Sequence, residues 1–159
     1  NKRVFEEAGI QAEFVQDNQA LSGYGVLRGL HYQIEPMAQA KLVRVLEGRV
    51  LDVAVDLREG SPTYGKSFSI ELSAENKRQL YIPRGFAHGY AVLSERAIFF
   101  YKCDNYYSPQ HEGGIRFDDP ALGIDWQLPP EAIILSEKDS RLPRFGQHRR
   151  RMEDPVFAT

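Results

Sequence analysis

Short apolar runs separated by turn residues are the feature that most constrains how this chain folds. Between residues 13 and 103, short and mostly apolar stretches recur with Gly, Pro, Asn or Asp between them. Phe68, Ile70 and Leu72 alternate with polar neighbours, the period-two pattern of a strand with one buried face. A helix is predicted only over residues 3–8, before Gly9. Many short strands without intervening helices favour a β-sandwich, barrel or jelly roll.

Turn residues also predict how the strands connect. Glu47-Gly48 lies between two β-branched runs, so we expect a tight hairpin there. After residue 104 the chain is irregular and rich in loop-forming residues. Basic residues cluster in the stretch 145–159, which predicts a variable tail that is solvated or disordered.

Length and composition limit the classes of protein to consider. A chain of 159 residues without an internal repeat or linker predicts one domain over residues 1–159. Lys and Arg total 20 against 22 for Asp and Glu, so the basic excess of a nucleic-acid binder is missing. The single cysteine, Cys103, allows no internal disulfide and suits a reducing compartment. No apolar run reaches the ~20 residues of a membrane span. We therefore expect a cytoplasmic protein with neither a nucleic-acid nor a membrane partner.

The stretch GVLRGLHYQ, residues 25–33, combines an apolar strand pattern with an arginine and a histidine. In a regular strand Arg28 and His31 point to opposite faces of the sheet. A β-bulge at Gly29 would add one residue and bring both side chains to the same face. The sequence therefore predicts a bulge at this glycine if the strand lines a pocket.

Further polar residues fall on strands that are otherwise apolar. His88, like His31, is flanked by glycine, which often lets a ligand approach the backbone closely. Lys41 shares strand parity with Val43, and Tyr101 shares parity with Phe99, so both polar side chains are predicted to point inward. Buried Lys and Tyr side chains each need a partner, which indicates a polar pocket inside the sandwich.

Two kinds of chemistry compete for such a pocket. A catalytic metal is disfavoured, because the sequence has no HxH, HxxxH or CxxC spacing. Acid–base chemistry without a metal fits better, since an imidazole titrates near neutral pH and works best with a carboxylate on its other nitrogen.

Several long motifs, in order, carry a family resemblance. They are GVLRGLHYQ, AKLVRVLEGRVLDVAVDLREGSPTYGK, ELSAENKRQLYIPRGFAHGYAVLSE, YKCDNYYSPQHEGGIRFDDPALGIDW and LSEKDSRLP. Over most of the chain, from Phe14 to Pro143, the sequence resembles the dTDP-4-dehydrorhamnose 3,5-epimerase family. The resemblance implies an all-β cupin-type jelly roll, or double-stranded β-helix, with a few short helices. It also implies a homodimer that uses no metal and no organic cofactor.

The resemblance implies a reaction on a dTDP-linked 4-keto-6-deoxy hexose. The C3 and C5 protons of dTDP-4-dehydro-6-deoxy-D-glucose are acidic because both carbons lie beside the C4 ketone. Removing a proton gives an enolate, and returning it on the other face inverts the centre. The product would be dTDP-4-dehydro-L-rhamnose, a precursor for cell-surface polysaccharide.

Site residues follow from the resemblance position by position. His31 matches the base and Asp139 the carboxylate that orients it, although Asp139 alone is typical of a helix cap or turn. Lys41 matches the cation that stabilises the enolate, and Tyr101 the tyrosine that exchanges a proton on the other face. The substrate-binding positions are Arg28 and His88 for the diphosphate, Gln16, Asn18 and Glu112 for other polar groups, and Tyr107 or Tyr106 for stacking on thymine.

Other functions remain open from the sequence. A relative that epimerises only C3 or only C5, or a ketoisomerase on a related sugar, would need the same residue types. A non-catalytic sugar-nucleotide-binding cupin explains Arg28 and His88 but leaves the other polar residues without a role. The family pattern also has an N-terminal strand pair, with a diphosphate-binding arginine, to which this sequence has no counterpart.

Overall fold

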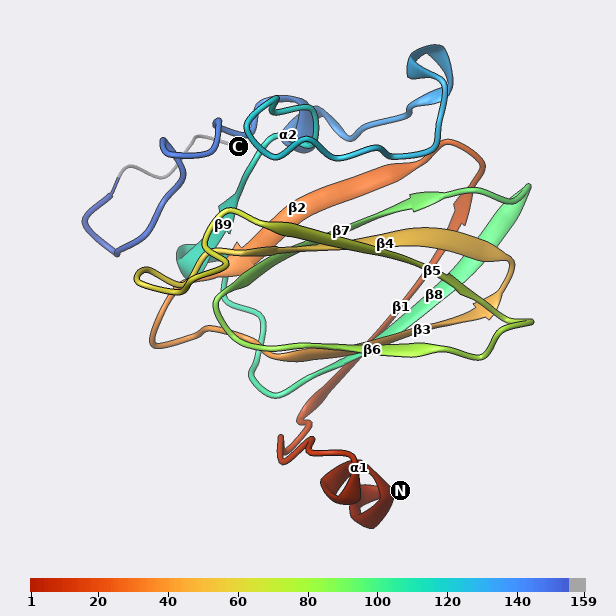
Figure 1. The fold of residues 1–159 in the computed structure, drawn as a ribbon, viewed down its shortest axis with the longest axis horizontal. Coiled ribbons are helices and arrows are strands. Elements are labelled where there is room, and N and C mark those ends of the chain that lie inside the picture. Colours follow the sequence, from red (N-terminus) through yellow and green to blue (C-terminus); the bar gives the residue numbers. More distant parts are fainter. Residues whose placement is uncertain (155–159) are drawn as a thin grey trace.

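Two antiparallel sheets packed face to face form the body of the protein, in a computed structural model that describes residues 1–154 (Figure 1). The four-stranded sheet has the order β1-β8-β3-β6 and the five-stranded sheet the order β5-β4-β7-β2-β9. The strands are β1 (Gln16–Gly23), β2 (Leu27–Gln33), β3 (Lys41–Glu47), β4 (Arg49–Asp56), β5 (Ser67–Ser73), β6 (Gln79–Ile82), β7 (Phe86–Val92), β8 (Arg96–Cys103) and β9 (Glu112–Gly114). The helical pieces are α1 (Lys2–Glu7), η1 (Pro109–His111), η2 (Pro130–Ala132) and α2 (Glu137–Ser140). The predicted all-β class with a few short helices is confirmed.

The inner strands β4 and β7 of the five-stranded sheet are buried on both faces, which their sequences reflect. On β4, Val50 and Ala54 belong to the core between the sheets, whereas Leu51, Val53 and Val55 belong to a second core on the outer face. The irregular chain after β9 covers this outer face with Leu122 and Trp126, among others. This burial on both sides is why β4 is a nearly continuous apolar run rather than an alternating one.

The predicted bulge in β2 is present. Arg28 lies opposite Tyr90 and His31 opposite His88, so two residues of β2 stand against Gly89 alone on β7. Gly29 has a φ of +121°, and a Cβ there would lie 2.7 Å from the Cα of Gly89. Only glycine fits this position, and the extra residue turns Arg28 and His31 to the same side of the sheet.

The predicted hairpin at Glu47-Gly48 is wrong. β3 pairs with β6 and β8, whereas β4 pairs with β5 and β7, so the two consecutive strands belong to different sheets. Gly48 has a φ of +74° and lets the chain cross from one sheet to the other, close to the carbonyl of Arg96. Local turn chemistry is similar for a hairpin and for a corner, and long-range pairing decides between them.

The prediction of a solvated or disordered tail is wrong for part of residues 145–154, because this segment packs against the protein through a few side chains, although Gly146, Gln147 and residues 150–153 are exposed. His148 is 5% exposed and Arg149 is 3% exposed, and Phe145 packs against the outer core. In Figure 1 this C-terminal segment lies beside β9 and α2. Residues 155–159, the end of the predicted tail, lie outside the described residues. Within the described part of the chain, none of the helices has the length and apolar character needed to cross a membrane.

Candidate active site

Six of the predicted site residues line one cavity of about 310 Å³ between the two sheets. Three wall elements supply them: the five-stranded sheet, the four-stranded sheet, and the short helix α2 with its N-cap. The six residues are Arg28 and His31 from β2, His88 from β7, Lys41 from β3, Tyr101 from β8 and Asp139 from α2. Sheet packing therefore gathers side chains that are far apart in the sequence.

His31 and Asp139 form a close pair at one wall. The Nε2 atom of His31 lies 2.6 Å from Oδ1 of Asp139, and the bulged amide of Gly29 donates to Oδ2 at 3.2 Å. Burial raises the pKa of Asp139, but the hydrogen bond and charge of His31 and the Gly29 amide outweigh it, so the pKa lies below its ordinary value. The carboxylate accepts Nε2–H, which leaves Nδ1 of a neutral His31 free to take a proton.

The α2 backbone holds Asp139 in this position. Ser136 is the N-cap of the helix, and its hydroxyl accepts the amide of Asp139 at 3.0 Å. The interpretation of Asp139 as a helix-cap or turn residue is therefore wrong, because Asp139 lies inside α2 and the cap is Ser136, three residues earlier. Capping fixes the start of α2, and the side chain of Asp139 is then directed at β2.

Lys41 and Tyr101 face the cavity from the opposite sheet. The Nζ atom of Lys41 lies 5.8 Å from the centre of the Tyr101 ring. Burial lowers the pKa of Lys41 and raises the pKa of Tyr101 to about 12. The phenol therefore holds its proton at neutral pH and is able to donate it. The inward orientation predicted from strand parity is confirmed for both residues.

His88 has a carboxylate partner that the sequence did not indicate. Its Nε2 lies 2.9 Å from Oδ2 of Asp52, a fully buried residue of β4. Oδ1 of Asp52 has no hydrogen-bond partner among the described residues. Asp52 orients the imidazole of His88, whose Nδ1 is left for other contacts.

Arg28 provides a positive charge at the cavity wall. Its guanidinium is hydrogen-bonded to the Ser22 hydroxyl of β1, with the NH2 group at 3.2 Å. Within residues 1–154 it makes no ion pair with a carboxylate. A planar guanidinium with unused donors matches the oxygen atoms of a phosphate group.

The remaining predicted residues form a rim beside the cavity. Oε1 of Gln16 accepts the Tyr107 amide at 2.9 Å, and the Tyr107 hydroxyl donates to Oε2 of Glu112 at 3.2 Å. Lys138, which lines the cavity, forms an ion pair with the same Glu112 oxygen. Asn18 contacts Gln16 and the thiol of Cys103. Tyr107 is 54% exposed, and Tyr106, its alternative, is 61% exposed.

Sequence reasoning missed Asp52, Lys138 and the aromatic floor of the cavity. Tyr90 and Phe99 stack with ring centres 4.0 Å apart and separate the polar site from the core. Lys138 is adjacent to Asp139 in the sequence, and this position could have indicated that it lies at the site. Asp52 stands in the run RVLDVAVD, where its parity with Val50 and Ala54 marks a carboxylate that points between the sheets.

The described part of the chain holds no candidate metal centre. No group of three or more His, Cys, Asp and Glu side chains is placed to hold an ion there. His31 and His88 each use one ring nitrogen on an aspartate.

Comparison with known proteins identifies close relatives. The family model described as dTDP-4-dehydrorhamnose 3,5-epimerase matches residues 1–147. A dTDP-4-dehydrorhamnose 3,5-epimerase of Pseudomonas aeruginosa is 59% identical over 147 residues, which cover 92% of this chain and 80% of that protein.

Solved structures agree with the sequence match. The crystal structure of dTDP-4-dehydrorhamnose 3,5-epimerase from Elizabethkingia anophelis has a TM-score of 0.89 and 60% identity, over 92% of this chain and 80% of that one. A 3,5-epimerase from Legionella pneumophila, solved in complex with dTDP-4-keto-L-rhamnose, has a TM-score of 0.83 and 52% identity. That match covers 91% of this chain and 81% of the other.

Proposed function

This chain belongs to the dTDP-4-dehydrorhamnose 3,5-epimerase family, and we propose that its cavity inverts C3 and C5 of a dTDP-linked 4-keto-6-deoxy hexose. The chain is an isomerase of this type, with relatives at 50–59% identity that carry the same name. The substrate is dTDP-4-dehydro-6-deoxy-D-glucose and the product dTDP-4-dehydro-L-rhamnose.

This proposal rests on one observation: residues able to transfer a proton lie on opposite walls of the cavity. His31 belongs to the five-stranded sheet and Tyr101 to the four-stranded sheet, and both line the same cavity. Inversion of a carbon requires that the proton leave from one face and return to the other. A sugar ring held between the sheets presents one face to Nδ1 of His31 and the other to the Tyr101 hydroxyl.

The first step uses the His31–Asp139 pair. Nδ1 of His31 takes the proton from the carbon beside the C4 ketone, and the electron pair moves toward the ketone oxygen. Asp139, kept ionised by its surroundings, stabilises the imidazolium that forms. Lys41 supplies positive charge for the developing enolate oxygen, in a setting where burial strengthens the interaction.

The second step returns a proton from the opposite wall. Tyr101 keeps its proton because burial raises its pKa, and it donates to the enolate carbon from the four-stranded sheet. His31 then releases its proton to solvent and the Tyr101 phenolate takes a proton from solvent, so both groups return to their starting states. The same pair of groups serves C3 and C5 in turn, because both carbons flank one ketone.

Binding residues hold the nucleotide part of the substrate. Arg28 and Nδ1 of His88 are proposed to contact the diphosphate, since both line the same cavity as the proton carriers. Gln16, Asn18 and Glu112 provide polar contacts at the rim. The exposed ring of Tyr107 is proposed to stack on the thymine base.

We also propose that the protein is a homodimer that works in the cytoplasm. β1 is an edge strand, and its outward-facing Leu21 is 64% exposed, which suits a surface covered by a second copy. The lone Cys103 is unpaired and buried, as expected of a protein kept in a reducing compartment. Light scattering during size-exclusion chromatography tests the dimer, and a monomer at micromolar concentration would contradict it.

Deuterium exchange tests the reaction. The protein is incubated with dTDP-4-dehydro-6-deoxy-D-glucose in deuterated water, and C3 and C5 are followed by NMR. We expect deuterium at both carbons, together with the L-rhamno configuration. Deuterium at only one carbon would instead identify a single-site epimerase.

A histidine variant provides the matched control. His31→Asn removes the proposed base, whereas His111→Gln changes a histidine of η1 whose Nδ1 is paired with the Ser108 hydroxyl outside the cavity. Exchange should be lost in the first variant and kept in the second. A wild-type protein that exchanges neither carbon would contradict the proposed function.

A further inference from the structure

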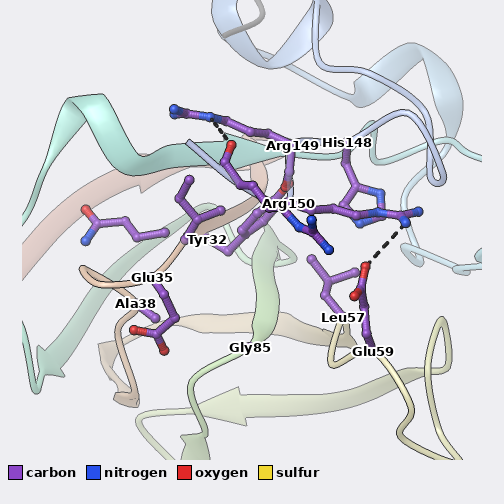
Figure 2. Close-up of a pocket in the computed structure, with 12 residues that line it drawn as sticks. Tyr32, Glu35, Ala38, Leu57, Glu59, Gly85, His148, Arg149 and Arg150 are labelled. Carbon is purple, nitrogen blue, oxygen red and sulfur yellow. Dashed lines mark hydrogen bonds and ion pairs between the residues drawn. The ribbon is translucent and has the colours of Figure 1, made fainter. Parts of the chain in front are cut away.

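The C-terminal segment 145–154 packs against the back of the strand that carries His31. Figure 2 shows His148, Arg149 and Arg150 of this segment around a cavity that Tyr32 and Leu57 also line. The family model ends at residue 147, so Arg149 lies beyond the matched region. Its contacts are therefore a property of this chain that the family match does not describe.

The Arg149 side chain is buried without an acidic partner among the described residues. It is 3% exposed, and it takes part in no ion pair among residues 1–154. Its donors go instead to backbone carbonyl oxygens, with NH1 at 2.6 Å from Gln110 and 3.4 Å from Glu112. A buried guanidinium is costly unless its donors are used, so these carbonyls must stay in place for the charge to remain buried.

The two carbonyls belong to the segment that presents Glu112 to the site. Gln110 lies in η1 and Glu112 begins β9, which pairs with β2 through Gln33 and Glu112. The Glu112 carboxylate forms the ion pair with Lys138, which lines the cavity next to Asp139. Arg149 thus contacts the main chain of a residue whose side chain organises the rim.

A second contact ties the same segment to β2. The Tyr32 hydroxyl donates to the Arg149 carbonyl at 2.7 Å, and Tyr32 immediately follows His31. The ring of Tyr32 also covers Gly113, where an added Cβ would lie 2.5 Å from the ring. Arg149 therefore joins the back of β2 and the start of β9 at one point.

We propose that Arg149 is a positioning residue for substrate binding, acting through the Glu112 carboxylate and its partner Lys138. This inference rests on the proposed function, because it concerns the same cavity. It differs from a purely structural role in one respect. The effect of Arg149 on substrate binding must pass through Glu112, so it disappears when the Glu112 carboxylate is already gone.

A double-mutant cycle tests this dependence. Arg149→Gln is measured in the wild-type background and in the Glu112→Gln background, with KM and kcat taken from the exchange assay. We expect KM to rise roughly tenfold in the wild-type background and to change less than about twofold in the Glu112→Gln background, as coupled neighbours behave. Arg150→Gln is the matched control, because Arg150 is adjacent and, within residues 1–154, its side chain pairs with Glu59 at the surface.

A conservative variant guards against loss of folding. Arg149→Lys keeps the charge but lacks the planar fork, whose Nε and NH2 donors reach the carbonyls of Arg151 and Met152 while NH1 reaches Gln110 and Glu112, and it should show a smaller KM increase with the same dependence on Glu112. If Arg149→Gln does not fold, the cycle with Arg149→Lys decides the matter. Equal KM increases in both backgrounds, or a lower melting temperature with unchanged KM, would overturn the positioning role. An inactive wild-type protein would overturn the proposed function instead.

Discussion

Asp139 shows how much of the site depends on single atoms. One of its oxygen atoms accepts from His31 and the other from the bulged Gly29 amide. We predict that Asp139→Asn lowers kcat by about 10²–10⁴-fold, the size typical of a disabled general base. The amide has no charge to stabilise the imidazolium and is able to turn its NH₂ group toward Nε2, which favours the wrong tautomer.

The exchange rates at C3 and C5 measure this effect in deuterated water. Asp118→Asn is a suitable control, because Asp118 pairs with Arg116 at the surface. An Asp139→Asn protein that is folded and retains more than about half of the wild-type rate would show that the base has another partner.

Tyr101 gives a prediction about stereochemistry rather than rate alone. In Tyr101→Phe the His31–Asp139 pair is intact, so a proton is still removed and returned from the same face. We expect deuterium to enter at the reacting carbons while the configuration is retained, because the opposite wall no longer supplies a proton. NMR distinguishes exchange with retention from epimerisation, and Tyr81→Phe on β6 is the control.

Inversion at the normal rate in Tyr101→Phe would mean that another group donates the second proton. Exchange that stops completely at both carbons would instead place Tyr101 in the first step.

At the scale of residues, strand parity correctly predicted which side chains point inward. It did not predict which residues those side chains contact. Lys41 and Tyr101 point inward as their apolar neighbours indicate. The pairing of His88 with Asp52 was not predictable in this way, because it joins residues 36 positions apart through sheet register. Parity states which face a side chain occupies, and only the tertiary pairing of strands states what lies opposite.

At the scale of elements, the β2 bulge links backbone geometry to chemistry. We predict that Gly29→Ala destabilises the protein by about 1–3 kcal/mol or more, since a side chain at positive φ is strained. The new Cβ would also meet the carbonyl of His88 at 2.7 Å. Relief of this clash must move β2 from β7, so the His31–Asp139 geometry and activity should be lost as well.

Urea unfolding and the exchange assay together measure the Gly29→Ala effect. Gly60→Ala is the matched control, because Gly60 has a φ of +81° and open space where its Cβ would stand. Equal losses of stability and activity in the two variants would mean that backbone strain alone matters and that the close packing of β2 on β7 does not.

Sequence patterns predicted some strands and missed others. Apolar alternation found the strands of the two cores, but it did not find β1, whose sequence QDNQALSG is largely polar. β1 is an edge strand, and its inward Ala20 lines the cavity, whereas Gln16 and Asn18 lie at the rim and contact Tyr107 and Cys103. Where a strand lines a polar cavity, hydrophobic periodicity is weak for a functional reason. The hairpin predicted at Gly48 is wrong for a different reason. The strands on either side of this glycine, β3 and β4, pair with other strands and not with each other.

At the scale of the whole molecule, two cores share one sheet, and the C-terminal segment extends the outer one. Its basic composition predicted exposure, yet burial is decided by what the segment contacts. The His148 ring stacks on Phe145 with centres 5.3 Å apart and meets Tyr32 edge-on at 6.2 Å. The basic composition is an average over all side chains of the segment. Its packing on the protein depends on these few residues.

Docking of His148 makes a prediction about stability and pH. Burial, helped by the charge of Arg150 and opposed by Glu59 and Asp154, lowers the pKa of His148 from 6.5 to about 4. Between these values the unfolded chain binds a proton that the folded protein does not, so stability falls as the pH drops through this window. From pH 7 to pH 5 the loss from this residue is about 2 kcal/mol.

Urea unfolding at pH 7 and pH 5 isolates this loss when wild type is compared with His148→Gln. The glutamine variant loses ring packing and is less stable at pH 7, but its stability should fall about 2 kcal/mol less on acidification. His111→Gln should keep the wild-type pH dependence, because His111 lies outside this contact. The carboxyl groups with lowered pKa values, Asp56, Asp118, Asp139 and Asp154, are present in both proteins and cancel in the comparison. If His148→Gln and wild type lose the same free energy, His148 is solvated and the C-terminal segment is not docked in solution. The positioning role of Arg149 would then fail with it, since both residues depend on the same contact with β2.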